Sequence, residues 1–191
     1  MKNLIPRDIS WLSFNARVLQ EAAADTVPLW EHIRFLGIFS NNLDEFFRVR
    51  VATLKRMIQF GSKAKVHLED NPEKIVEEIQ MIVLNQQSEF NRIWEAILEE
   101  MKDQKIFLVS EKDLNPEQQE FVQRYYDDEV SANVIPLMIE TIQDLPFLRD
   151  KSNYLGVVMS KKESALKRMY SIIEIPTRVQ SRFVLLPSPD D

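Results

Sequence analysis

The chain has 191 residues, enough for one sizeable domain or two small ones. Its 45% hydrophobic and 28% charged residues are typical of a globular protein and exclude a disordered one. A formal net charge of −6 argues against a general nucleic-acid-binding protein, and the absence of cysteine excludes disulfides, thiolate metal sites and a thiol nucleophile.

The first residues, "MKNLIPRDISWLSF", lack a continuous apolar core before a small-residue cleavage site, so they do not look like a signal peptide. No apolar run approaches the ~20 residues that span a bilayer. A chain without cysteine also suits a reducing compartment. We therefore expect a cytoplasmic location, with peripheral binding at the inner face of the membrane as the alternative.

In the first hundred residues apolar positions recur at three and four, which is the period of an amphipathic helix. A first helix is predicted from its cap, Asp8, to about Ala24. The turn "DTVPLW" leads into a second helix with Pro28 in its first turn, where a missing N–H costs nothing. This second helix is predicted to run as far as the asparagine pair Asn41–Asn42.

A third helix is predicted to start after the asparagine pair and to stop at Gly61. Its apolar stripe is Leu43, Phe47, Val51, Leu54 and Ile58. A long fourth helix is predicted over 71–101, with Pro72 in its first turn. Four helices joined by short loops indicate an antiparallel bundle over residues 1–105.

From Ile106 onward the pattern becomes mixed. "IFLVS" resembles a short strand, and Asn115 with Pro116 marks the start of another helix. Three further runs, bounded by turn residues, are typical of neighbouring antiparallel strands: "NYLGVVMS", "RMYSIIEIP" and "RFVLLPSPD". The fold class predicted is therefore mainly α with a smaller α+β part, a helical bundle (1–105) followed by the beginning of a mixed α/β domain (106–191).

The stretch "SNNLDE" allows a purely structural interpretation. Asn42, followed three residues later by Glu45, has the form of a helix capping box, and Ser40 or Asn41 could cap as well. A cap accounts for one asparagine but not for two. Asp44 stands four residues before Arg48, a spacing that favours a weak ion pair on one helix face.

Several stretches together resemble the start of bacterial polyphosphate kinase, the long type that works through a phosphohistidine. They are "ISWLSFNARVLQEAA", "PLWEHIRFLGIFSNNLDEFFRVRVATLKR", "LPFLRDKSNYLGV" and "YSIIEIPTRVQSRFVLLP". The resemblance implies that 1–105 is the N-terminal helical domain of this family and that 106–191 is the opening part of its head domain.

The resemblance implies an enzyme that transfers the terminal phosphate of ATP reversibly to polyphosphate, with Mg²⁺ neutralising the phosphates. Its partners would be ATP or ADP, inorganic polyphosphate and further copies of itself, as a dimer or larger oligomer with contacts in the head domain, and no nucleic acid. The phosphorylated histidine and the Mg²⁺ ligands are expected outside this chain. Neither His32, interpreted as a partly exposed helical residue, nor His67, in a charged loop, matches a catalytic position.

In the family the second asparagine of "SNNLDE" contacts the nucleotide, and that position is Asn42 here. A carboxamide can bind an adenine edge or a ribose hydroxyl without carrying charge. Because Asp44 and Glu45 would repel phosphate from a helix start at this point, we expect Asn42 to meet the base or sugar. Asn41 is the second candidate, as a further contact or as the cap that holds Asn42 in place.

A cluster of basic residues follows the motif: Arg48, Arg50, Lys55 and Arg56. It is either a solvated surface or one wall of an anionic channel. A different class of function also stays open, in which the chain is a helical scaffold or dimerisation module that binds no nucleotide.

Overall fold

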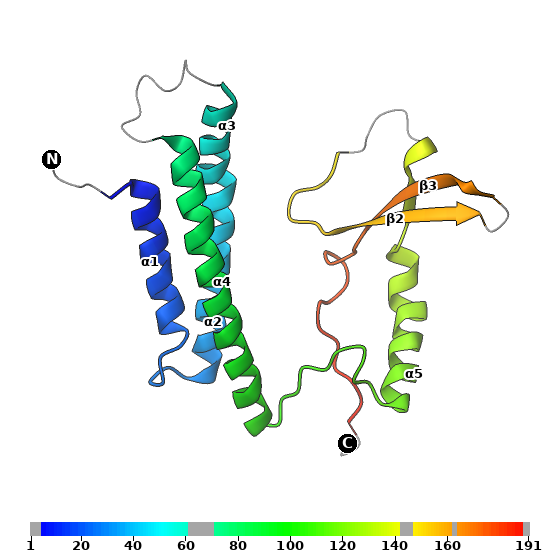
Figure 1. The fold of residues 1–191 in the computed structure, drawn as a ribbon. Helices are drawn as coiled ribbons and strands as arrows, with labels where there is room; N and C mark the ends of the chain where they lie inside the picture. The colour runs from blue at the N-terminus through cyan, green and yellow to red at the C-terminus, as the bar shows by residue number, and fades with distance from the viewer. Residues whose placement is uncertain (1–4, 61–70, 142–146, 162–163, 189–191) are drawn as a thin grey trace. The chain divides into compact units, whose positions relative to one another are not determined.

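The computed structural model describes residues 5–60, 71–141, 147–161 and 164–188 (Figure 1). Two compact units divide the chain, Met1–Leu108 and Val109–Asp191. The division falls after Leu108, whereas the sequence places the change after Lys105. In the described ranges no helix combines the length and the apolar character that crossing a membrane requires.

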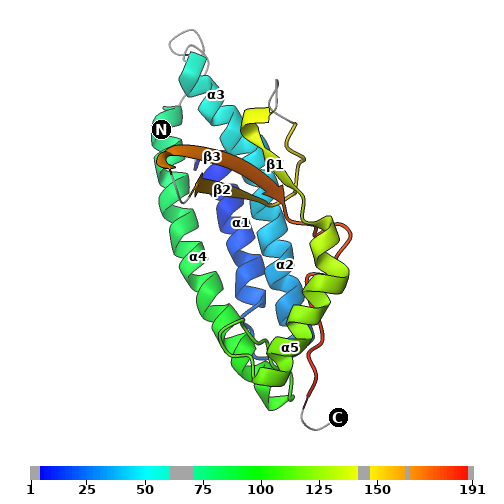
Figure 2. The same cartoon turned by 90° about the vertical axis from the view of Figure 1, so that its right-hand side faces the viewer.

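The first unit consists of helices packed side by side. They are α1 (Arg7–Glu21), α2 (Leu29–Phe46), the π-helical turn η1 (Phe47–Val51), α3 (Ala52–Phe60) and α4 (Pro72–Asp103). Because α2, η1 and α3 follow one another without a loop, the described residues of this unit form three helical rods where the sequence predicts four helices (Figure 1, Figure 2). The mainly helical class and the bundle are confirmed. The predicted stop at Gly61 lies outside the described residues.

The predicted helix break at the asparagine pair is wrong. Asn41 and Asn42 lie inside α2, which continues to Phe46, so neither residue is a cap and Glu45 completes no capping box. Asparagine costs only ~0.7 kcal/mol in a helix interior, which packing between helices readily overrides. Pro28, expected in the first turn of this helix, precedes it as the N-cap residue.

The π-helical turn explains the spacing of the apolar stripe. Leu43, Phe47 and Val51 recur in steps of four, which would drift around an α-helix with 3.6 residues per turn. Hydrogen bonds of the i→i+5 type wind the chain more loosely, so steps of four stay on one face through η1. All three side chains pack in one core cluster as a result.

Two apolar clusters hold the bundle together. The first joins the start of α1 to the end of α2, η1, α3 and the first half of α4, around buried Leu12, Phe46, Leu54 and Ile79. The second joins the end of α1 to α2 and the second half of α4, around Leu19, Leu36, Phe39, Ile93 and Ile97. The long helix α4 therefore contributes to both clusters.

Both ends of α4 have local causes. Asn71 caps its start by accepting a hydrogen bond from the Glu73 N–H, with Pro72 in the first turn as predicted. At its end Lys105 takes a left-handed φ of 60°. The N–H groups of Lys105 and Ile106 then bond the carbonyls of Lys102 and Met101 at 2.9 Å each. This is the Schellman pattern, and it turns the chain out of the helix.

The second unit begins with α5 (Pro116–Tyr125), whose predicted start is confirmed: Asn115 and Gln118 form a reciprocal capping box. Short helical turns η4 (Tyr126–Val130) and η5 (Ser131–Asn133) follow. The antiparallel sheet has the order β1-β3-β2, with the bounds β1 (Pro136–Met138), β2 (Tyr154–Lys161) and β3 (Ser164–Glu174), and η6 (Ile139–Thr141) after β1. Leu155 pairs with Ile173 and Val157 with Ser171.

Two predicted strands are wrong within the described residues. The segments 106–110 and 182–188 form no helix or strand and belong to no sheet. Their β-branched and aromatic composition favours a strand, but a strand also needs a neighbour with which to form hydrogen bonds. The runs that became β2 and β3 have that neighbour in each other.

Candidate functional site

The stretches "ISWLSFNARVLQEAA" and "PLWEHIRFLGIFSNNLDEFFRVRVATLKR" meet where α1 packs against the continuous α2–η1 segment. Three cross-helix pairs join them, and we call this set the α1–α2 ladder: Asp8–Arg50, Trp11–Phe46 and Asn15–Asn42. The α1 members are spaced by three and four residues and the α2–η1 members by four, so each set lies on one helix face. The two segments run antiparallel, so the first residue of one set meets the last of the other.

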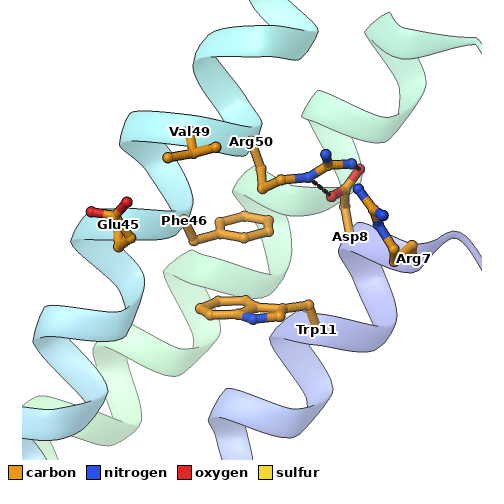
Figure 3. A pocket seen from close by; sticks show the side chains of 7 residues that line it. All are labelled: Arg7, Asp8, Trp11, Glu45, Phe46, Val49 and Arg50. Carbon is orange, nitrogen blue, oxygen red and sulfur yellow. Dashed lines mark hydrogen bonds and ion pairs between the residues drawn. The ribbon is translucent and has the colours of Figure 1, made fainter.

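Asp8 and Arg50 form the charged pair of the ladder (Figure 3). Arg50 donates from Nε to Asp8 Oδ1 at 2.7 Å and from Nη2 to Oδ2 at 3.2 Å. The Asp8 side chain is only 10% exposed and that of Arg50 37%. Asp8 therefore does not cap α1 as predicted. The hydrogen bond from Arg50 to Asp8 raises the pKa of Arg50 above its usual value. The negative charge of Asp8 adds to this effect, and the partial burial of Arg50 opposes it.

Trp11 and Phe46 form the aromatic pair, with ring centroids 4.5 Å apart and planes inclined by 7°. Phe46 is buried and Trp11 half-buried. Beside these rings lies a cavity of about 340 Å³, which Arg7, Asp8, Trp11, Glu45, Phe46, Val49 and Arg50 line. Figure 3 shows the two rings lying one over the other, with the Asp8–Arg50 pair beside them. The aromatic pair of the ladder therefore lies next to the charged pair Asp8–Arg50.

Asn15 and Asn42 form the amide pair. Asn42 Nδ2 donates to Asn15 Oδ1 at 3.1 Å, and Asn15 Nδ2 donates to the carbonyl oxygen of Phe39 at 3.2 Å. Asn15 is fully buried, and Asn42 is half-buried. No described residue donates a hydrogen bond to Asn42 Oδ1. The carbonyl oxygen of Asn42 is thus a polar atom of the ladder that no described residue occupies.

Asn41 does not act as a helix cap, because it lies inside α2. It lies one helical step (about 100°) away from Asn42 and is exposed, and it makes no side-chain hydrogen bond with the described residues. The expectation that Asn41 holds Asn42 in place is wrong, because Asn15 does so. Sequence reasoning missed Asn15. The available signal was a polar residue on the apolar stripe between Leu12 and Leu19, at helical spacing.

The basic cluster does not form one uniform surface. Arg50 is engaged with Asp8, while Arg48 bonds Asp44 at 2.9 Å, which confirms the predicted i,i+4 pair. Lys55 and Arg56 are exposed on α3.

His32 is a partly exposed helical residue, as predicted. Its side chain is 12% exposed, its Nδ1 lies 3.9 Å from the Glu100 carboxylate, and its Nε2 is buried without a partner. His67 lies outside the described residues. Over the described part of the chain, no group of three or more His, Cys, Asp or Glu side chains is placed to hold a metal ion.

Comparison with known proteins identifies the family to which the chain belongs. The model of the polyphosphate kinase N-terminal domain matches residues 4–109, and that of the polyphosphate kinase middle domain matches 117–191. The chain is 41% identical to a polyphosphate kinase of Vibrio parahaemolyticus over 187 residues and 39% identical to one of Escherichia coli K12. Each alignment covers 97% of this chain and 26% of the relative.

A crystal structure of polyphosphate kinase from Porphyromonas gingivalis superimposes with a TM-score of 0.73 at 32% identity. The superposition covers 95% of this chain and 27% of the Porphyromonas gingivalis chain. This chain therefore spans about a quarter of the length of the proteins it matches. The N-terminal-domain model alone covers more than half of the chain, including every rung of the α1–α2 ladder. This chain belongs to the polyphosphate kinase family.

Proposed function

We propose that this chain is the nucleotide-contacting, non-catalytic portion of a polyphosphate kinase that transfers the terminal phosphate of ATP reversibly to polyphosphate. Family membership supports the reaction, since the relatives carry the name polyphosphate kinase. The contact that we assign to this chain is made by Asn42, to the base or sugar of ATP or ADP.

The observation that carries this proposal is the amide pair. Asn15 holds Asn42 from the buried side, and Asn42 keeps a carbonyl oxygen free of any described partner. A side chain that is already ordered loses less entropy when a ligand binds, so its hydrogen bond contributes more to affinity. A solvated asparagine on a helix surface would lack this preorganisation.

The neighbours of Asn42 favour a base or sugar over a phosphate. Ile38, Asn42, Glu45 and Val49 are spaced by four, three and four residues and so share one stripe of α2 and η1. Ile38 is 40% and Val49 47% exposed, and both are apolar. The Glu45 carboxylate would repel a polyanion. Because α2 is continuous through Asn42, no helix start lies at this point to attract phosphate.

The phosphates need cations that this face does not gather. We propose that the phosphorylated histidine and the Mg²⁺ ligands belong to parts of the polypeptide outside this chain. Mg²⁺ would neutralise charge on the transferred phosphate there. Lys55 and Arg56, exposed on α3, are the residues of the basic cluster left for polyphosphate or for carboxylates of a partner domain.

A second proposal concerns the second unit, which we expect to make contacts within an oligomer. Its large apolar side chains are widely exposed: Phe147 by 92%, Phe183 by 74% and Leu185 by 94%. Such residues on a small unit commonly mark interaction surfaces. Sedimentation of the full polypeptide, with and without Phe183→Ser, would test this, and an unchanged oligomeric state would contradict a role for Phe183.

The nucleotide proposal is tested in the full polypeptide that carries this chain. Asn42→Ala is expected to weaken ATP binding about five- to thirtyfold, the effect of losing one or two hydrogen bonds. Asn91→Ala, at an exposed asparagine of α4, is the matched control and should leave affinity unchanged. Asn41→Ala measures whether the neighbouring amide contributes. Unchanged ATP affinity in Asn42→Ala would leave the helical scaffold as the better description.

A further inference from the structure

The amide pair has a direction that hydrogen-bond chemistry alone sets. The Phe39 carbonyl oxygen can only accept a hydrogen bond. The Asn15 atom that faces it at 3.2 Å must therefore be the NH₂ group, and no rotation of that amide by 180° is allowed. With its NH₂ group turned to Phe39, Asn15 turns its carbonyl oxygen to Asn42.

The orientation of the Asn15 amide determines that of the Asn42 amide. Asn15 Oδ1 is an acceptor, so the atom of Asn42 that faces it at 3.1 Å must be a donor, Nδ2. The backbone carbonyl of Phe39 thereby determines the amide orientation of both asparagines. The carbonyl oxygen of Asn42 is the atom left to face away from Asn15.

We infer that Asn15 is a positioning residue that fixes Asn42 with its carbonyl oxygen towards the ligand, so that the nucleotide site presents a hydrogen-bond acceptor. This inference rests on the proposed contact between Asn42 and the nucleotide. The ligand group that meets Asn42 is then a donor. A nucleotide offers such donors on the base, as the 6-amino group of adenine, and on the sugar, as the ribose hydroxyls.

A purely structural role for Asn15 accounts poorly for its chemistry. Asn15 is 0% exposed and stands in α1 between the core residues Leu12 and Leu19. An apolar side chain of similar shape would fill the same space without a polar group that must be satisfied. What an amide adds at this position is the orientation of Asn42.

The test compares nucleotide discrimination in the full polypeptide for wild type, Asn15→Leu, Asn15→Ser and Asn42→Ala. The dissociation constants of ATP, ITP, 2′-deoxy-ATP and 3′-deoxy-ATP are measured beside each melting temperature. ITP carries a 6-oxo acceptor in place of the 6-amino donor, and the deoxy nucleotides each lack one hydroxyl. The nucleotide that wild type binds weakly thus identifies whether the donor lies on base or sugar.

Gln86→Leu is the matched control. Gln86 is also a buried amide, and its Nε2 donates to a helix carbonyl, that of Leu12, at 3.0 Å. Removing it costs a bond of the same kind in the same unit but touches neither asparagine. A loss of discrimination that merely follows lower stability would appear in this control as well.

Wild type should bind one analogue about five- to thirtyfold more weakly than ATP. Both Asn15 variants should reduce that ratio severalfold, while Gln86→Leu keeps the ratio whatever change in melting temperature it causes. Equal binding of all four nucleotides by wild type, or an unchanged ratio in a folded Asn15 variant, would overturn the role of Asn15. Unchanged ATP affinity in Asn42→Ala would instead overturn the proposed contact itself, so the two failures are separable.

Discussion

Arg50 holds the buried carboxylate of Asp8 through two hydrogen bonds, of 2.7 and 3.2 Å, across the boundary between α1 and the π-helical turn η1. Removing a charge partner from a buried carboxylate is costly because the remaining charge cannot return to water. Arg50→Ala should therefore lower the free energy of unfolding by about 1–3 kcal/mol, the figure being reduced for the partial exposure of Arg50.

The pair also predicts an asymmetry. Asp8→Asn should cost less than Arg50→Ala, because the 37% exposed arginine can turn to solvent and the 10% exposed carboxylate cannot. Arg34→Ala, which breaks an exposed pair with Glu31 on α2, is the control and should stay within ~0.5 kcal/mol of wild type. Urea unfolding of the chain measures all three. An equal effect of Arg34→Ala and Arg50→Ala would show that the Asp8 pair has no special weight.

The buried apolar residues of the described chain all lie between Ile9 and Ile97, so the first unit should fold by itself. Among the residues of the second unit whose burial is described, Ser171 alone is buried. A chain of residues 1–108 should give a helical circular dichroism spectrum and a cooperative unfolding transition. Amides of β3 should exchange with deuterium faster than those of α4 in the intact chain. A non-cooperative transition of 1–108 would contradict this division of stability.

The pair of Glu89 and Arg92 should respond to pH. Arg92 donates two hydrogen bonds to Glu89, at 2.9 and 2.6 Å, and these hold the pKa of the Glu89 carboxyl below its ordinary value. A lowered pKa in the folded state means that the stabilisation is present above the unfolded-state pKa and is lost as pH falls through the folded-state value. The melting temperature of Arg92→Gln should thus lie slightly below wild type near neutral pH and approach it at about pH 3. A gap that widens in acid would contradict the assigned sign.

The isolated chain should not form a phosphohistidine. His32 is mostly enclosed, with Nε2 buried and Nδ1 lying 3.9 Å from the Glu100 carboxylate, so Nε2 is closed to a phosphate and Nδ1 stands beside a negative charge. A carboxylate beside the ring would also repel the incoming anion. Incubation with labelled ATP and magnesium should leave the 191-residue chain unlabelled. Acid-labile, base-stable label that disappears in His32→Gln would show a nucleophile that this arrangement excludes.

Local signals predicted some of these features well. Proline in the first turn predicts the helix starts near Asn71 and Asn115, with Asn115 as the predicted cap, and the structure confirms both starts. Each of the two asparagines bonds a group only two or three residues away. The same local logic failed at Asn42, because its amide bonds a residue 27 positions away on another helix. No pattern within "SNNLDE" distinguishes an amide that caps a helix from one that bonds a neighbouring helix.

The strands and the ladder show the same limit. Segments 106–110 and 182–188 have strand composition but no partner strand in the described sheet, and partner choice depends on tertiary structure. Asp8 looks like a helix cap from its sequence position, yet it bonds Arg50, 42 residues away. Spacing along one helix identifies the residues that share a face, but it does not identify the face that they meet.

The amide pair reverses the expected effect of introducing aspartate at position 42. As a cap, Asn42 would tolerate Asn42→Asp, because asparagine and aspartate cap about equally well. Inside α2 the new carboxylate would instead face the Asn15 carbonyl oxygen, and two acceptors cannot bond each other. Asn15 cannot rotate to help, because its NH₂ group serves the Phe39 carbonyl. Asn42→Asp should therefore destabilise the chain by about 1–2 kcal/mol near neutral pH.

Asn71→Asp supplies the contrast, since Asn71 is a true cap at the start of α4 and should accept the change at almost no cost. The loss in Asn42→Asp should shrink at about pH 4, where a protonated carboxyl can donate to Asn15. An acceptor opposite a carboxyl raises the pKa of that carboxyl in the folded state. The loss of stability is therefore complete only above the folded-state pKa and shrinks as pH falls below it. Thermal unfolding of both variants at the two pH values measures this. Equal stability of Asn42→Asp and Asn71→Asp at neutral pH would mean that the Asn15–Asn42 bond does not hold α1 to α2.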